Sequence, residues 1–167
     1  MKVKVRIPQK LLQDVRNDLL RPHAFAAERV GFLYGRLVSG RSLQVLMTEY
    51  EPLADDRYVR DPHSGARIDS QAIRGGMQGV LDKHQGAFHV HMHYWPGHPK
   101  MSRMDAEEIP RVITAFQRVG SQHAHGIFLL HDVECATWVW LPGANDAVQA
   151  DAIAVVGFPL QIFRGAV

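Results

Sequence analysis

The sequence feature that most constrains the fold is a strict alternation over residues 88–94, which run Phe-His-Val-His-Met-His-Tyr. A period of two places successive side chains on opposite faces of a β-strand, so three imidazoles share one face and apolar side chains share the other. The apolar face is expected to join the core. Three neighbouring histidines are poorly explained by packing, whereas imidazoles at the end of a twisted strand can converge on one ion and are favoured zinc ligands. We therefore expect a metal site beside this strand.

Strand-like and helix-like patterns alternate along the rest of the chain. Strands are expected at residues 2–7, 28–38, 43–50 and 87–94, as a pair within 126–141, and as a last strand over 153–163 that a proline interrupts. Helices are expected at 8–20, 70–83 and 104–119. Residues 39–42 run Ser-Gly-Arg-Ser, which predicts a β-hairpin turn, and the polar stretch 54–69 predicts a surface loop. The sequence therefore predicts one mixed α/β domain over residues 1–167, with a mixed β-sheet flanked by helices.

Composition excludes several classes of protein. With 46% hydrophobic and 22% charged residues among 167, the chain is too apolar to be disordered and long enough to bury a core. Its 19 basic and 17 acidic residues are spread without a basic run, so neither nucleic acid nor an anionic membrane is expected as a partner. No apolar stretch approaches the length of a membrane span, and the single cysteine, Cys135, excludes an intramolecular disulfide. These properties favour a cytoplasmic protein.

A third metal ligand is needed, because catalytic zinc usually has three protein ligands and one open position. The candidate is Asp105, in the sequence Ser-Arg-Met-Asp that begins at Ser102. Ser-x-x-Asp is also a common capping pattern, in which the serine hydroxyl accepts a hydrogen bond from a free backbone N–H of a new helix. The turn-rich loop 94–99 can fold back and bring Asp105 to the end of the histidine strand. Beside that strand we favour a metal ligand over a cap alone.

These residues resemble the motif of the JAMM, or JAB/MPN, metalloproteases, which is a glutamate near the N-terminus, then His-x-His, about seven residues, Ser, two residues and Asp. Here eight residues separate His91-Met-His93 from Ser102 and Asp105. Upstream, Glu28 begins a Glu-Arg-Val-Gly-Phe-Leu-Tyr-Gly sequence similar to the glutamate-bearing strand of the family. The resemblance covers essentially the whole chain and implies a single JAB/MPN-like domain of the bacterial stand-alone type.

The resemblance also implies a mechanism and a class of partner. One zinc ion per chain is held by His91, His93 and Asp105, with a water in the fourth position. Glu28 moves a proton from that water to the leaving amine, and the Ser102 hydroxyl hydrogen-bonds the developing oxyanion. The implied reaction is hydrolysis of isopeptide or peptide bonds that join ubiquitin or a ubiquitin-like protein to conjugates or precursors. Activating-like and conjugating-like enzymes are the implied further partners.

Alternatives remain for both the ligand set and the function. His89 and His91 could be the ligand pair, and His98 lies nearby in sequence, although we prefer His91 and His93 because their distance to Ser102 is closer to the motif. Alternative functions are a catalytically inactive MPN scaffold and a peptidase that acts on small peptides or frees a sulfur-carrier protein. Loss of motif residues is the usual mark of a scaffold, and none is lost here.

Other reactive or aromatic residues are expected to be structural. Cys135 lies within a strand-like segment and lacks the sequence signature of a cysteine protease, so we expect it in the core. Trp138 and Trp140 are two residues apart and share a face of the same strand. We expect them to serve packing rather than to clamp a substrate.

Overall fold

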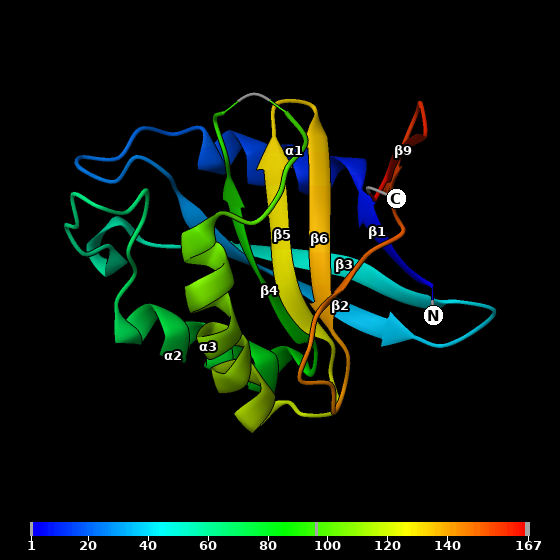
Figure 1. Cartoon of the computed structure of the whole chain (residues 1–167). Helices are drawn as coiled ribbons and strands as arrows, with labels where there is room; N and C mark the ends of the chain where they lie inside the picture. The colour runs from blue at the N-terminus through cyan, green and yellow to red at the C-terminus, as the bar shows by residue number, and fades with distance from the viewer. Residues whose placement is uncertain (1, 96, 166–167) are drawn as a thin grey trace.

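The computed structural model describes residues 2–95 and 97–165, and within them the chain forms one nine-stranded sheet with three α-helices (Figure 1). The elements are β1 (Val3–Pro8), α1 (Gln9–Leu19), β2 (Val30–Val38), β3 (Leu43–Pro52), the short 3₁₀ helix η1 (Asp55–Arg57), α2 (Ser70–Lys83), β4 (Gly86–Met92), α3 (Arg103–Val119), β5 (His125–His131), β6 (Glu134–Trp140), β7 (Val148–Gln149), β8 (Ala152–Val156) and β9 (Gln161–Arg164). None of the helices among these residues is long and apolar enough to cross a bilayer.

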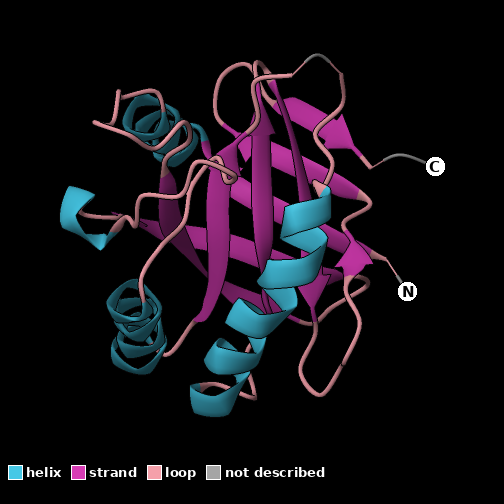
Figure 2. Ribbon diagram, turned by 60° about the vertical axis from the view of Figure 1, so that its left-hand side comes forward, coloured by secondary structure: helices cyan, strands magenta, loops and turns pink. Residues whose placement is uncertain are grey.

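The sheet is mixed and curled, with the strand order β7-β6-β5-β4-β2-β3-β1-β8-β9. β1 pairs in parallel with β3 and β8, β4 pairs in parallel with β5, and the remaining neighbours are antiparallel. α1 buries Leu12, Val15 and Leu19 against one face, and α2 and α3 pack on the other, where α3 crosses the sheet in Figure 2. The predicted mixed α/β class and the β2–β3 hairpin are confirmed.

Strand β4 is buried on both faces. Phe88, Val90 and Met92 join the core beneath α1, as the alternation predicts. His89 lies on the opposite face, where its ring meets Phe32 edge-on at a centroid distance of 6.2 Å. The strand ends at Met92 rather than at residue 94, but the His93 N–H still donates to the carbonyl of Leu130 over 2.9 Å. The three histidines therefore follow one another along the end of a fully enclosed strand.

Glycines in α2 allow close packing of that helix. A Cβ atom at Gly79 would lie 2.1 Å from the hydroxyl oxygen of Tyr34, and one at Gly76 would lie 2.8 Å from the Phe116 ring. Glycine lowers intrinsic helix stability by up to about 1 kcal/mol per position. Here it lets α2 approach both β2 and α3, so that these helices cover the sheet beside β4.

The strands differ from the sequence predictions in three places. The proline in segment 153–163 interrupts it as predicted, but the chain also reverses there, so the segment forms the antiparallel pair β8 and β9 rather than one strand. The two-residue strand β7 was not predicted, since so short a segment carries no periodicity. β2 begins at Val30 rather than residue 28, so Glu28 lies in the segment that leads into the strand.

Candidate metal centre

The predicted site residues meet in one cleft of about 760 Å³, although they come from three separate parts of the chain. His91 lies on β4, His93 follows the end of that strand, and Asp105 lies in the first turn of α3. Val30 of β2 pairs with His91, so the antiparallel register places the segment before β2 opposite the end of β4. Glu28 enters the cleft from this segment.

The donor atoms of three side chains converge. The Nε2 atoms of His91 and His93 lie 2.8 Å apart, Asp105 Oδ1 lies 3.3 Å from Nε2 of His91, and Asp105 Oδ2 lies 3.3 Å from Nε2 of His93. Tetrahedral zinc with ligand distances near 2.0–2.1 Å separates its ligand atoms by about 3.4 Å. The distances to Asp105 fit that geometry, and the two nitrogens need to part by only about 0.5 Å to fit it as well.

Glu28 belongs to the same cluster. One carboxylate oxygen of Glu28 and one ring nitrogen each of His91 and His93 all lie within 4.8 Å of one another, so this triad could also hold a metal ion. Burial raises the pKa of Glu28 above its ordinary value, and the nearby charge of Asp105 adds to the rise, while His91 and His93 oppose it. Its neighbours therefore stabilise the charged form of Glu28 less than they stabilise that of Asp105.

Asp105 is held in its charged form. Burial would raise its pKa, but hydrogen bonds from His91, His93 and Ser102 outweigh burial and lower the pKa far below the usual range. The side chains of His91 and His93 are 4% and 1% exposed, and that of Asp105 is 12% exposed. A buried carboxylate between two imidazoles strongly favours a cation at this point.

His89 contacts the His91 ring at Nδ1, the nitrogen that does not face Asp105. Its Nδ1 atom lies 3.3 Å from Nδ1 of His91, so one of these nitrogens donates a hydrogen bond to the other. Burial lowers the pKa of His89 to about 3, with the charge of His91 acting in the same direction, so the ring is neutral near pH 7. A neutral His89 can accept a hydrogen bond from the Nδ1–H of His91, which leaves the Nε2 lone pair of His91 free for a metal.

Ser102 forms the predicted helix cap and also orients Asp105. Its Oγ accepts a hydrogen bond from the Asp105 backbone N–H over 3.0 Å and lies 2.7 Å from Asp105 Oδ2. The Ser102 backbone N–H donates to the same Oδ2 over 2.8 Å, which completes a capping box. The capping interpretation is therefore confirmed, and the same hydrogen bonds hold the carboxylate against the two imidazoles.

The loop from residue 59 to 68 contacts Glu28, which the sequence did not reveal. The Gly65 carbonyl accepts hydrogen bonds from the backbone N–H groups of Ala27 and Glu28 over 2.8 and 2.9 Å. A Cβ atom at Gly65 would lie 2.6 Å from both Cδ and Oε2 of Glu28. The loop therefore fixes the backbone of Glu28 and limits the space for its carboxylate. Gly65 itself was visible in the sequence only as a turn signal.

Trp95 was also missed as a site residue. Its ring stacks on the His93 imidazole with a centroid distance of 3.9 Å and an interplanar angle of 29°. Among the described residues, Nδ1 of His93 has no hydrogen-bond partner and is buried. Stacking by Trp95 therefore supports the ring whose Nδ1 has no partner, while its Nε2 lies against Asp105.

The remaining candidates lie elsewhere. His98 contacts Glu134 at the start of β6 and does not line the cleft. Cys135 is 2% exposed in the core beneath α1, and burial raises its pKa to about 12, so it is an unreactive thiol. Trp138 and Trp140 pack with the core on the α2 and α3 side, as predicted.

Comparisons with known proteins give little further information. No protein-family model matches the chain, and no curated protein matches it. A solved structure described as the STIL N-terminal domain of Trichoplax adhaerens is similar with a TM-score of 0.39 and 11% sequence identity, over 80% of this chain and 40% of that one. The chain thus spans less than half the length of that protein, and so low a TM-score supports no conclusion about fold family or function.

Proposed function

We propose that this protein is a zinc-dependent JAMM-type amide hydrolase with a JAB/MPN-like fold. The proposal rests on one observation above all: His91, His93 and Asp105 bring their donor atoms to within 2.8–3.3 Å of each other in a cleft that also contains Glu28. The same residues carry the resemblance to the JAMM motif in the sequence. A catalytically inactive scaffold is less well supported, because all the motif residues are present and converge.

His91, His93 and Asp105 would hold the ion. Asp105 is preferred to Glu28 as the third ligand because both of its oxygens lie 3.3 Å from an imidazole nitrogen and its charge is stabilised by the capping box. Two imidazoles and a carboxylate favour zinc over magnesium or calcium, which prefer oxygen ligands. The chemistry supplied by bound zinc is a lower pKa of water, near 7, and polarisation of a carbonyl.

Glu28 is assigned the proton transfer. Its carboxylate borders the imidazoles, and its backbone is held by Gly65, so it can accept a proton from water and return it to the leaving amine. The raised pKa of Glu28 brings it nearer to the working pH, which suits a general base that must also act as an acid. Asp105 is unsuited to this role because its oxygens are engaged by Ser102 and both imidazoles.

Ser102 has the geometry for two functions. Its Oγ accepts from the Asp105 N–H and lies beside the Asp105 carboxylate, at the wall of the cleft. When a carbonyl oxygen enters, the hydroxyl proton can turn from Asp105 toward that oxygen and stabilise the negative charge that develops on it. The cap is preserved, because the bond from the Asp105 N–H uses a lone pair of Oγ rather than its proton.

The substrate class follows from the family resemblance. We assign hydrolysis at the C-terminus of a ubiquitin-like protein, in conjugates or precursors, with activating-like and conjugating-like enzymes as further partners. Apolar side chains, including Ile68, Ile73 and Ile109, line the cleft together with charged residues of the loop and α3, so the cleft offers both types of contact to an extended chain.

A cleavage assay tests the proposed function. The substrate is a ubiquitin-like protein joined through its C-terminus to the lysine side chain of a fluorescent peptide, and a short peptide with the same scissile bond serves as a second substrate. We expect the wild type and His98→Ala to cleave the conjugate, dipicolinate to abolish cleavage, and added zinc to restore it. Full activity after complete metal removal would contradict the proposal, and cleavage of the short peptide alone would favour the small-peptide peptidase.

A further inference from the structure

One face of the sheet has no helix over it at the strands beyond β2. Val3, Val5 and Ile7 of β1 are buried with α1, whereas the alternate residues Lys4 and Arg6 are exposed on the opposite face. Among the described residues, the core cluster beneath α2 and α3 contains none from β1, β3, β8 or β9. In Figure 1 the β2–β3 hairpin and β9 extend away from these two helices. We call the uncovered outer surface of β1, β3, β8, β9 and residues 36–38 the open face.

The strand register brings four cationic side chains together on the open face. Arg36 of β2 and Arg6 of β1 flank one position of β3, and Lys4 of β1 and Arg164 of β9 flank one position of β8. All four side chains are exposed. Neighbouring strands lie about 4.8 Å apart and alternate residues of a strand about 7 Å apart, so neighbouring cations are spaced by about 7–10 Å. Their fields therefore add, because the Debye length is about 10 Å at 0.1 M salt.

Carboxylates do not neutralise these cations. None of the four lies within ion-pair distance of an acidic side chain among the described residues. Glu49 and Glu51, farther along β3, are bound by Lys83 of α2 over 2.9 and 2.7 Å. The sequence predicts no anionic partner because it has no basic run and a formal charge of only +2. Strand pairing nevertheless concentrates positive charge that is scattered along the chain.

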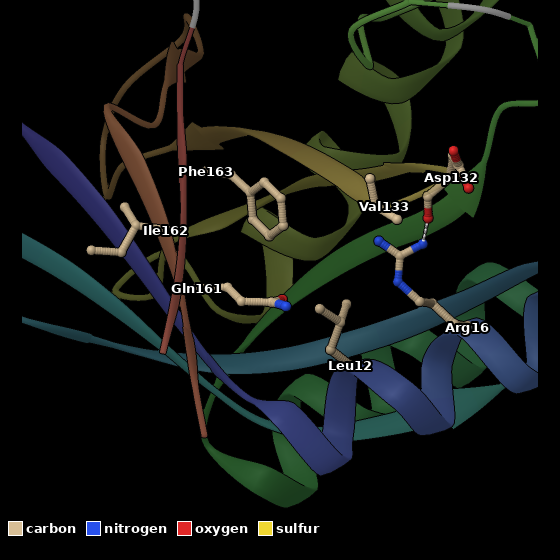
Figure 3. A pocket seen from close by; sticks show the side chains of 7 residues that line it. All are labelled: Leu12, Arg16, Asp132, Val133, Gln161, Ile162 and Phe163. Carbon is tan, nitrogen blue, oxygen red and sulfur yellow. Dashed lines mark hydrogen bonds between the residues drawn. The ribbon is translucent and has the colours of Figure 1, made fainter. Parts of the chain in front are cut away.

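Strand β9 also presents an apolar side chain on the open face. Figure 3 shows Gln161 and Phe163 directed toward Leu12 of α1, and Ile162 directed to the opposite side of the strand. Ile162 and Arg6 flank one position of β8, and directly paired residues point to the same face of a sheet. Ile162 therefore lies in the same row as Arg6, beside the cations.

The β8–β9 hairpin extends this apolar surface beyond the cations. Val156 of β8 and Ile162 of β9 are 52% and 53% exposed. Phe158 and Leu160, in the segment that joins the two strands, are 95% and 60% exposed. An exposed cluster of large apolar side chains is a mark of an interaction surface. The open face thus combines unneutralised cations with a protruding apolar hairpin.

We propose that the open face and the β8–β9 hairpin bind the surface of an anionic lipid membrane. Lysine and arginine side chains attract anionic headgroups, and exposed phenylalanine and leucine side chains insert at the boundary between headgroups and acyl chains. The metal cleft shares no residue with this surface, so binding does not require the metal.

Other occupants fit the surface less well. Single-stranded nucleic acid needs aromatic side chains on which bases stack, and the two cationic rows contain none among the described residues. Phosphate contacts alone would leave the apolar hairpin unused. A second copy of this chain would bring four cations against four cations, which repel each other.

Vesicle sedimentation tests the proposal. The probes are vesicles of phosphatidylcholine alone and of an equal mixture of phosphatidylcholine and phosphatidylserine. We expect the protein to sediment with the mixed vesicles only, and high salt to weaken binding because it screens the charges. Metal-free protein should bind equally well, so this result is independent of the proposed hydrolase function. Equal sedimentation with both kinds of vesicle, or with neither, would overturn the proposal.

Charge variants test the role of the cations. Lys4→Gln combined with Arg6→Gln should weaken binding to the mixed vesicles by roughly 25-fold, since each cation near an anionic surface contributes about 5-fold. The matched control combines Arg74→Gln and Arg118→Gln, which remove the same charge from exposed positions of α2 and α3. The control should bind nearly as the wild type does. Equal losses in both double variants would mean that net charge alone drives binding and would overturn the proposal.

An apolar variant separates a membrane from other anionic partners. Phe158→Ala should weaken binding to the mixed vesicles by roughly 10-fold, and its exposure means that the core is untouched. Leu20→Ala, at an exposed leucine that follows α1, should bind as the wild type does. Unchanged binding in Phe158→Ala would overturn the proposal. Binding of a labelled oligonucleotide without any binding of vesicles would assign the open face to nucleic acid and overturn it as well.

Discussion

Replacing Gly65 by alanine should misplace the Glu28 carboxylate without removing any functional group. The new Cβ would lie 2.6 Å from Glu28 Cδ and Oε2, whereas carbon atoms in ordinary contact lie at about 3.5–4.0 Å. The carboxylate must therefore move by about 1 Å, and a displacement of that size costs roughly 10²-fold in rate for a group that must be aligned with the reacting atoms. The carbonyl of residue 65 keeps its bonds to the backbone of residues 27 and 28, because alanine retains the main chain.

The assay compares the turnover number, KM and zinc affinity of Gly65→Ala with those of the wild type on the ubiquitin-like conjugate. We expect the turnover number to fall by roughly 10², with little change in zinc affinity, since the ligands are untouched. The matched control is Gly75→Ala, where a new Cβ has nothing within 4 Å and should leave turnover unchanged. Wild-type turnover in a folded, zinc-loaded Gly65→Ala enzyme would refute the placement of Glu28 at the reacting bond.

Three further predictions address individual side chains. Glu28→Gln should retain zinc and thermal stability but cleave the conjugate ~10²–10⁴-fold more slowly in single-turnover assays, and unchanged cleavage would make Glu28 an ordinary surface residue. Ser102→Ala should lose about 1 kcal/mol of stability as a cap and, separately, slow turnover by roughly 10²-fold; loss of stability alone would leave Ser102 as a cap only. His125 is buried with a pKa lowered to about 4 from 6.5, chiefly by burial. Between these pH values the unfolded chain binds the proton and the folded chain does not, so stability should fall as pH drops through this window, by up to about 3 kcal/mol, and urea unfolding of His125→Gln should show a smaller fall than the wild type.

Local patterns predicted much of the fold because they depend on neighbouring residues alone. The alternation in β4 and the helical spacing of Leu12, Val15 and Leu19 arise from strand and helix geometry, and both elements formed as expected. Pro159 marked the interruption of segment 153–163, but no local pattern indicates that the chain reverses there and that β8 pairs with β9.

The candidate site was predictable only where a motif named its residues. The spacing of His91, His93 and Asp105 identified them, but their approach depends on β4 and α3 packing across the cleft. The contacts of Gly65 with Glu28 and of Trp95 with His93 left no periodic signal. Such contacts between distant segments are fixed by tertiary packing, which local propensities do not encode.

Zinc binding tests the central claim most directly. Protein purified without a histidine tag should contain one zinc per chain by elemental analysis, and titration of the metal-free form should give the same stoichiometry. His91→Ala, His93→Ala and Asp105→Ala should each lose tight binding, while His89→Ala should weaken it by about 10–100-fold, because His89 contacts only the far nitrogen of His91. No zinc in the wild type, or full retention in His93→Ala together with loss in His89→Ala, would contradict the assigned ligands.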